Sequence, residues 1–122
     1  MDNGCEVIRQ SLDLSNTIGE GIQYVKLRFE AGHFEETLTL FQNVIEALLS
    51  IQKAVQPLVS NLSSNQLEYC SDNINSALQG IITAFEEGNR SMISGLIEQS
   101  LLPAYYKWQE ELERCFVPHI AS

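Results

Sequence analysis

Residues 18–32, IGEGIQYVKLRFEAG, place large apolar side chains at Ile18, Ile22, Val25 and Phe29 and end in Gly32. Steps of three and four residues put those side chains on one face of an α-helix. Glycine readily takes the left-handed conformation that ends many helices, so we expect the chain to reverse there. The stretch therefore predicts an amphipathic helix followed by a tight turn.

The same pattern returns 56 residues later, in INSALQGIITAFEEG at residues 74–88. Seven positions of the first half of the chain align in order with seven of the second. They are Ile18, Ile22, Val25, Phe29, Glu30, Gly32 and Leu40, which correspond to Ile74, Leu78, Ile81, Phe85, Glu86, Gly88 and Leu96. Each half is then a helix, a glycine turn and a helix. Two hairpins that are apolar on one face can bury that face against each other, so the sequence predicts an all-α antiparallel four-helix bundle built from two similar αα-hairpins.

The inward faces of the remaining helices follow the same spacing. The second carries Phe34, Leu38, Phe41, Ile45, Leu48, Val55, Val59 and Leu62, widened by Val44, Ile51 and Leu58. The third carries Leu67, Cys70, Ile74, Ala77, Leu78, Ile81, Ile82 and Phe85. The fourth carries Met92, Ile93, Leu96, Ile97, Leu101, Ala104, Tyr105, Trp108, Leu112, Cys115 and Phe116.

We expect a single domain over 1–122, with one hairpin at 5–62, a second at 64–116 and a short tail at 117–122. Asp, Ser and Asn at residues 13–16 compete for backbone hydrogen bonds, so we expect disorder or a break in the first helix. The string FEAGHFEE at residues 29–36 is similar to the turn of tetratricopeptide repeats. A two-hairpin scaffold of that kind is the alternative, although a solenoid needs about three units.

Five positions bear on where helices begin, bend and end. Ser63 and Gln66 have the spacing of a capping box that would open the third helix. Pro57 and Pro103 fall inside helical patterns, where each either kinks or breaks its helix. Pro118 is expected to end the last one.

Composition excludes several classes of partner. The chain has 122 residues, 44% of them apolar, and its 16 acidic and 7 basic residues give a formal charge of -9. This charge repels phosphate backbones and anionic lipids, so we expect neither nucleic acid nor membrane as a partner. Apolar runs stay far below the roughly 20 residues of a membrane helix. Three cysteines without a CxxC pair, and no apparent signal peptide, favour the cytoplasm.

Residues that carry chemistry are scarce. His33 and His119 both lie off the apolar stripes, and the Glu-x-x-His motif of di-iron bundles is missing. Cys70 and Cys115 lie on the stripes, where we expect inert core thiols. We therefore predict that the protein is not an enzyme, with no catalytic residues, no cofactor and no metal.

Residues 101–108, LLPAYYKW, hold the single tryptophan, two of the four tyrosines and a proline within a helix. One interpretation is that Tyr105 and Trp108 fill the core where Pro103 bends the helix. The other is a groove that binds an amphipathic helix of a partner protein or a second copy of the chain. The candidate binding residues are Leu101, Leu102, Tyr105, Tyr106, Trp108 and Leu112.

The length, the acidity and the four-helix layout together resemble small acidic helical proteins of bacteria, including flagellar export chaperones. The repeated Phe-Glu-x-Gly turn and the Leu-Leu-Pro-x-x-x-x-Trp segment are similar to those of uncharacterised bacterial helical domains. The resemblance to the chaperones implies a bundle that holds the helix of a client protein. We thus expect a non-enzymatic adaptor or chaperone-like module, with a self-associating structural or regulatory homodimer as the alternative.

Overall fold

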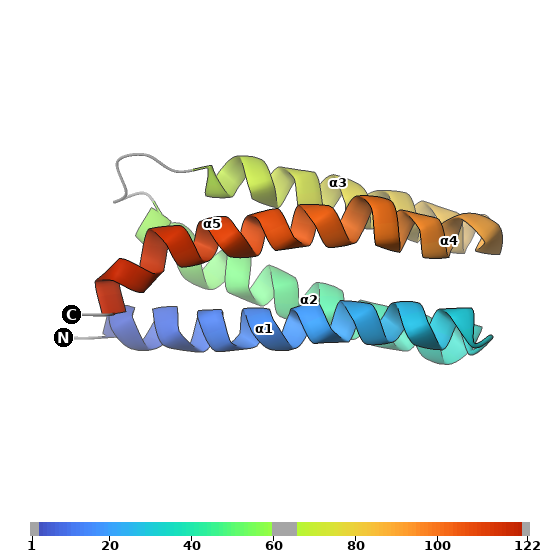
Figure 1. Cartoon of the computed structure of the whole chain (residues 1–122), viewed down its shortest axis with the longest axis horizontal. Coiled ribbons are helices and arrows are strands. Elements are labelled where there is room, and N and C mark those ends of the chain that lie inside the picture. Colours follow the sequence, from blue (N-terminus) through green and yellow to red (C-terminus); the bar gives the residue numbers. More distant parts are fainter. Residues whose placement is uncertain (1–2, 60–65, 121–122) are drawn as a thin grey trace.

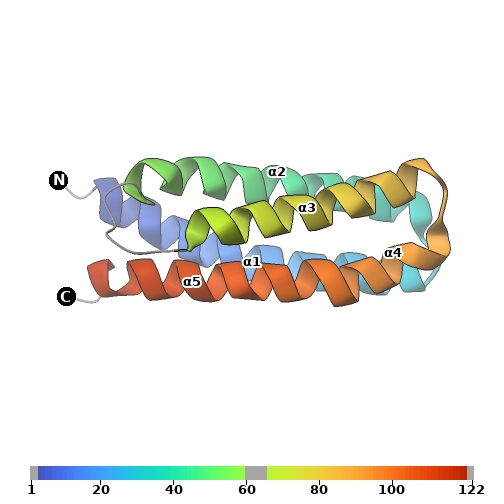
Figure 2. The same ribbon diagram turned by 90° about the horizontal axis from the view of Figure 1, so that it is seen from above.

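The computed structural model describes residues 3–59 and 66–120, which form a bundle of helices (Figure 1). Its elements are α1 (Asn3–Glu30), α2 (Phe34–Val59), α3 (Leu67–Glu86), α4 (Arg90–Leu96), the π-helical segment η1 (Ile97–Leu101) and α5 (Leu102–Ile120). The last three follow one another without a gap and form one continuous rod (Figure 2). The predicted all-α bundle is confirmed.

The hairpins lie against each other along their length. α1 packs against both α2 and α5, and α3 packs against α4 and α5. α1 begins and α5 ends at the same end of the bundle, opposite the turns that follow α1 and α3 (Figures 1 and 2). All helices contribute to a single buried cluster, whose fully enclosed members include Ile22, Leu48, Ile74, Ile97 and Trp108. One shared interior fits a bundle rather than the open stack of a repeat scaffold.

The two glycine turns have the same backbone geometry. Gly32 has φ 93° and Gly88 has φ 69°, both in the left-handed region. The amide of Gly32 donates to the carbonyl of Phe29, and the amide of His33 donates to that of Arg28. Gly88 and Asn89 make the equivalent bonds to Phe85 and Ala84. Each turn is therefore a Schellman motif, which satisfies carbonyls that the helix end leaves without partners.

An aromatic cluster joins the hairpins beside these turns. The ring centroid of Phe29 lies 4.9 Å from that of Phe34 and 6.0 Å from that of Phe85. Phe41 approaches Phe85 at 6.0 Å, and the guanidinium of Arg90 lies 3.9 Å from the centre of the Phe34 ring. Phe29, Phe34 and Phe41 come from the first hairpin, whereas Phe85 and Arg90 come from the second, so the cluster ties the two halves together.

Among the residues whose side chains the structure describes, the predicted stripes are wrong at two positions; Leu62 and the side chain of Val59 lie outside that set. Leu38 is 40% exposed and Met92 is 50% exposed. Thr37 takes the inward place at the start of α2 and is fully buried. Its hydroxyl donates to the carbonyl of His33, so burying this polar side chain leaves no unpaired group. The stripe of α2 is thus rotated by one residue at its start.

The expected break at residues 13–16 is also wrong, because α1 continues through them. The hydroxyl of Ser15 donates to the carbonyl of Leu12 at 2.7 Å, and that of Thr17 reaches the carbonyl of Asp13 at 3.4 Å. These side chains bond within the helix instead of competing with it. Ser15 is fully buried, against α5.

The prolines interrupt no helix. Pro57 lies in the last turn of α2, which continues to Val59. η1 lies just before Pro103, and the amide of Leu102 donates to the carbonyl of Ile97, five residues back. This wider turn accommodates a residue that has no amide hydrogen. The rod therefore continues past Pro103 without a break.

The predicted ends of the last two helices need correction. α5 includes Pro118 and runs to Ile120, so most of the expected tail at 117–122 is helical. A proline in the last turn removes only its own backbone bond, and the residues after it can stay helical. Ser63 lies outside the described residues. Gln66 is the N-cap of α3 and makes no side-chain cap bond, so it does not occupy the position the capping box required.

The turn geometry predicts the effect of adding a β-carbon. Gly32→Ala and Gly88→Ala should each lower the free energy of unfolding by about 1 kcal/mol, because L-residues are strained at positive φ. Urea denaturation measures the change. Gly80→Ala is the matched control, since Gly80 lies within α3 and a β-carbon there meets nothing within 4 Å. Gly80→Ala should raise the free energy of unfolding by about 0.5–1 kcal/mol. Equal losses of stability in all three variants would contradict the role of Gly32 and Gly88 in the turns.

Candidate functional site

The structure places most of the six candidate binding residues in the core. Leu101, Tyr105, Trp108 and Leu112 are at most 1% exposed. Leu102 is half-buried, and Tyr106 is 42% exposed. Steps of three and four carry the four buried residues along the inner face of the rod. Tyr105 and Trp108 therefore lie in the core, as the first interpretation expects, together with Leu101 and Leu112, so these four side chains do not form an open surface groove.

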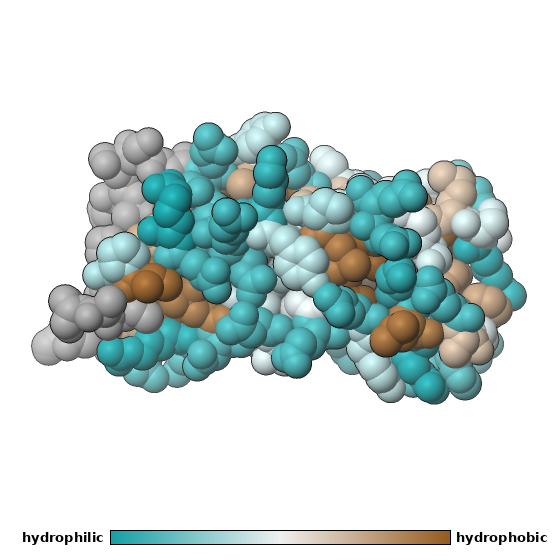
Figure 3. Space-filling model, in the orientation of Figure 1, coloured by the Kyte–Doolittle hydropathy of each residue, from teal (hydrophilic) through white to brown (hydrophobic). Residues whose placement is uncertain are grey.

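The surface over α1 and α5 agrees with this placement. Figure 3 shows a mainly hydrophilic face with hydrophobic spots that are separated from one another. Tyr106 reaches this side, where the amide of Gln23 donates to its hydroxyl oxygen. Scattered apolar residues of this kind are normal on a protein surface.

Hydrogen bonds hold α5 against α1. The hydroxyl of Tyr105 donates to the carbonyl of Ser15, and burial raises the pKa of that hydroxyl above its usual range. The side-chain amide of Gln109 donates to Asn16 Oδ1 at 2.8 Å and to Ser15 Oγ at 3.3 Å. A β-carbon on Gly19 would lie 3.3 Å from Cε2 of Tyr105, so this glycine allows the close approach.

Two neighbouring tyrosines give a matched test of this contact. Tyr105→Phe should lower the free energy of unfolding by about 1 kcal/mol, because the buried carbonyl of Ser15 loses its tyrosine donor. Tyr106→Phe removes an exposed bond and should change stability by less than about 0.5 kcal/mol. Chemical denaturation compares them, and similar losses would argue against a role for the buried hydroxyl.

A pocket of about 280 Å³ lies between α2 and α3, with a residue of α5 in its wall. α2 packs far less extensively against α3 than against α1. We call the cavity the α2–α3 pocket. Its lining is Gln52, Val55, Gln56, Leu67, Glu68, Ser71, Asp72, Asn75 and Trp108.

The lining of the α2–α3 pocket has an apolar floor and a polar rim. Val55, Leu67 and Trp108 are at most 4% exposed, so they form the floor. The rim carries amides, a hydroxyl and two carboxylates. The amide nitrogen of Gln52 lies 3.5 Å from Oδ1 of Asn75, which links α2 to α3 across the rim. Trp108 is thus the one of the six candidate residues that lines this pocket.

An apolar row on α2 continues from the pocket. Leu38, Ile45 and Leu49 share a helix face with Gln52 and Gln56, because these positions are separated by three, four or seven residues. Leu38 and Leu49 are 40% and 45% exposed, and Ile45 is half-buried. We call these three residues the α2 ridge. The apolar spacing predicts Leu38 and Ile45 on the inward face of the helix; Ile45 does pack against the core, whereas Leu38 is exposed and Leu49 lies off the predicted stripe.

Glu111 of α5 fixes the start of α3. Its carboxylate accepts the backbone amide of Gln66 at 2.7 Å and two bonds from Arg114 at 2.7 and 2.9 Å. These bonds lower the pKa of Glu111 to about 2, and those from Arg114 have the largest effect. The carboxylate caps the helix end that Gln66 leaves without a side-chain cap. Glu111 therefore positions Leu67 and Glu68, the first residues of the pocket wall.

The buried thiols lie beside this carboxylate. Sγ of Cys115 is 3.7 Å from Glu111. Burial, followed by the nearby charge of Glu111, raises the pKa values of Cys70 and Cys115. Both groups therefore stay protonated at neutral pH, which makes them weak nucleophiles.

The cap predicts a dependence of stability on pH. Glu111→Gln should cost about 1–2 kcal/mol at pH 7, because a charge-assisted bond to the helix end is weakened. The folded-state pKa lies below the unfolded value, so this contribution is complete above about pH 5 and disappears as the pH falls toward about 2. Urea titrations across this range measure it. Exposed Glu110→Gln is the control, and equal pH profiles for both variants would contradict the cap.

Arg28 and His33 both approach Glu36 beside the first glycine turn. The guanidinium of Arg28 pairs with Glu36 at 2.9 Å, and Nδ1 of His33 lies 3.8 Å from Glu36. The side chain of His119 lies outside the described residues. Among those that are described, no cluster of three or more His, Cys, Asp or Glu could hold a metal. No helix in the same part of the chain is long and apolar enough to cross a membrane.

The fold and the pocket define a small all-α bundle with a polar-rimmed cavity between two of its helices. The chain belongs to the family described as a domain of unknown function (DUF8042), whose model matches residues 6–111. This match includes both glycine turns and the residues that line the α2–α3 pocket. Comparisons with curated proteins and with solved structures each gave no match.

Proposed function

We propose that this protein is a non-enzymatic, cytoplasmic interaction module that binds an amphipathic helix of a partner protein along α2 and α3. The observation that carries the proposal is the α2–α3 pocket, with Leu38 and Leu49 of the α2 ridge exposed on the same helix face. Apolar anchors beside a cavity with hydrogen-bonding groups are what a helix-in-groove receptor presents.

The dimensions suit a helical ligand. Leu38 and Gln56 mark the two ends of the shared face and lie 18 residues apart on α2. At 1.5 Å per residue this face is about 27 Å long, the length of about five helical turns. Its first part is apolar and its last part is polar. A partner helix would accordingly place apolar side chains on the α2 ridge and a polar one in the pocket.

The chemistry supports binding rather than catalysis. The thiols of Cys70 and Cys115 are buried and free, and their raised pKa values disfavour nucleophilic reaction. Free buried thiols are also typical of a reducing compartment such as the cytoplasm. The expected likeness to flagellar export chaperones fits a module of this kind, since those bundles also hold helices.

A homodimer that uses the same face is the second candidate. The exposed side chains of Leu38 and Leu49 favour it, because a symmetric contact would bury both copies of each. The formal charge of -9 on every copy acts against it. Sedimentation at several concentrations and salt levels tests for such a dimer directly.

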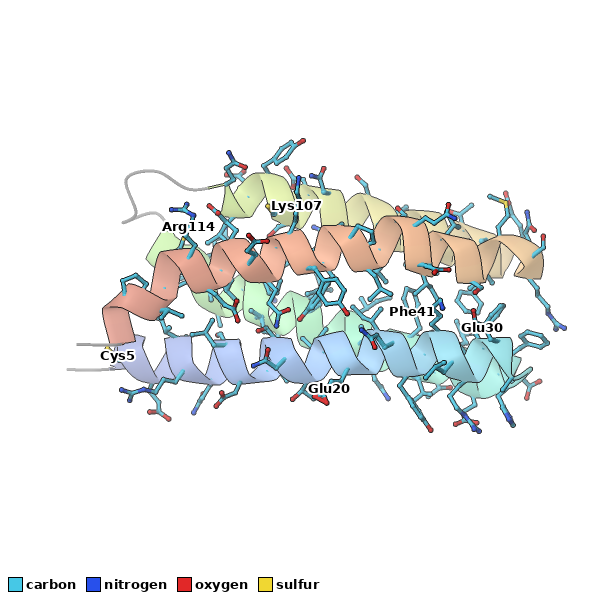
Figure 4. The ribbon with its side chains drawn as sticks, in the orientation of Figure 1. Cys5, Glu20, Glu30, Phe41, Lys107 and Arg114 are labelled. Carbon is cyan, nitrogen blue, oxygen red and sulfur yellow. The ribbon has the colours of Figure 1, made fainter. Side chains whose placement is uncertain are left out.

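Site-specific photo-crosslinking tests the proposal. A benzophenone amino acid placed at Leu49 or Gln56, in cells that naturally make the protein, should capture one discrete partner. The same group at Glu20, which points away from the bundle on α1 (Figure 4), should not. Equal capture at all three positions, or none at Leu49 and Gln56, would overturn the proposal. A crosslink to a second copy would select the homodimer instead.

Paired substitutions then locate the contact. Leu49→Ser should weaken binding of the captured partner about tenfold or more, because it removes an anchor of the α2 ridge. Leu27→Ser is the control, since Leu27 is 62% exposed on α1. Calorimetry with purified proteins measures both affinities. Equal affinities for the two variants would place the contact elsewhere.

A further inference from the structure

We infer that the α2–α3 pocket receives the side chain of a lysine or arginine, so that the partner is a basic amphipathic helix. This inference rests on the proposed function and names the chemistry of the ligand at the same face. It is based on the apolar floor of the pocket, the acidic and amide groups of its rim, and the negative charge of the whole chain.

The floor suits the stem of a long basic side chain. Val55, Leu67 and Trp108 present apolar surface at the base of a cavity of about 280 Å³. Lysine and arginine carry several methylene groups, which pack on apolar surface while the charged head stays near water. The indole ring of Trp108 in the floor adds attraction for a cation that comes within about 6 Å of the ring.

The rim suits the charged head. Glu68 and Asp72 are one helical turn apart on α3, and both line the pocket. Within the described ranges neither carboxylate has a basic partner, whereas Glu30, Glu36 and Glu111 each pair with a lysine or an arginine. The side-chain oxygens of Gln52, Gln56, Ser71 and Asn75 are further acceptors. A guanidinium, with five N–H donors, can use several of these groups at once.

The charge of the whole chain selects among possible occupants. A second copy would bring its own formal charge of -9 toward these carboxylates, and a nucleic acid would bring phosphates. A basic segment is attracted by the pocket and by the protein as a whole, which also raises its association rate. The α2 ridge then takes apolar residues of the same helix.

Butylguanidinium chloride is a probe that needs no knowledge of the partner. Trp108 is the only tryptophan of the chain and lines the pocket, so its fluorescence reports binding to the purified full-length protein. We expect saturable binding with a dissociation constant of about millimolar order. Butylurea, which has the same shape and no charge, should bind at least about tenfold more weakly, since a tenfold difference corresponds to about one charge-assisted hydrogen bond.

Two double variants separate the pocket carboxylates from overall charge. Glu68→Gln with Asp72→Asn should weaken butylguanidinium binding about tenfold. Glu86→Gln with Glu87→Gln removes the same charge from the far end of α3 and should leave binding unchanged. Thermal unfolding confirms that each variant is folded, and side-chain amide signals of Gln52 and Asn75 give a second measure of binding.

The outcomes distinguish this inference from the proposed function. Equal binding of butylguanidinium and butylurea, or equal losses in the two double variants, would overturn the cationic anchor. If position-specific crosslinking at Leu49 and Gln56 persisted in that case, the helix-binding module would stand without a basic partner. Selective binding of butylguanidinium that only the Glu68 and Asp72 variant loses would support the inference.

Discussion

The structure depends on the burial of one inward row of side chains on the last helical rod. Leu101, Tyr105, Trp108 and Leu112 fill the space between the two hairpins and are almost fully enclosed. Burying large apolar side chains is worth about 1.5–3 kcal/mol each, so this row is a major part of the driving force that holds the halves together. A hairpin alone could not enclose these residues, because it offers only one opposing helix.

Sharing one core also explains where the cavity arises. α1 and α5 can approach closely because Gly19 faces the ring of Tyr105, and Glu111 of α5 holds the start of α3. α2 and α3 meet less closely, and polar side chains line the space left between them. The helices that frame the α2–α3 pocket are therefore positioned by contacts made on other sides of the bundle.

The candidate site could be predicted only in part. The aromatic-rich composition of residues 101–108 points to Trp108 as a binding residue, and Trp108 does line the pocket, as part of its floor. Gln52, Gln56, Ser71 and Asn75 gave no signal in the sequence, because isolated amides and hydroxyls on helices are ordinary surface residues. Leu38 followed the apolar spacing as well as any core residue. Leu38 is exposed because the neighbouring Thr37 takes the inward position, where its hydroxyl bonds to the carbonyl of His33. Hydrophobic patterning counts threonine as polar and therefore does not predict this.

The sequence by itself determined the helices, the two glycine turns and the pairing of similar hairpins. These features depend on local spacing and on backbone conformations that glycine alone adopts without strain. Only the tertiary structure decided which apolar residues stay at the surface, how the rod passes Pro103 and which polar groups meet across α2 and α3. Those outcomes depend on how whole helices are rotated and spaced. Contacts between residues far apart in the sequence, such as the bond from Tyr105 to Ser15, set that rotation and spacing.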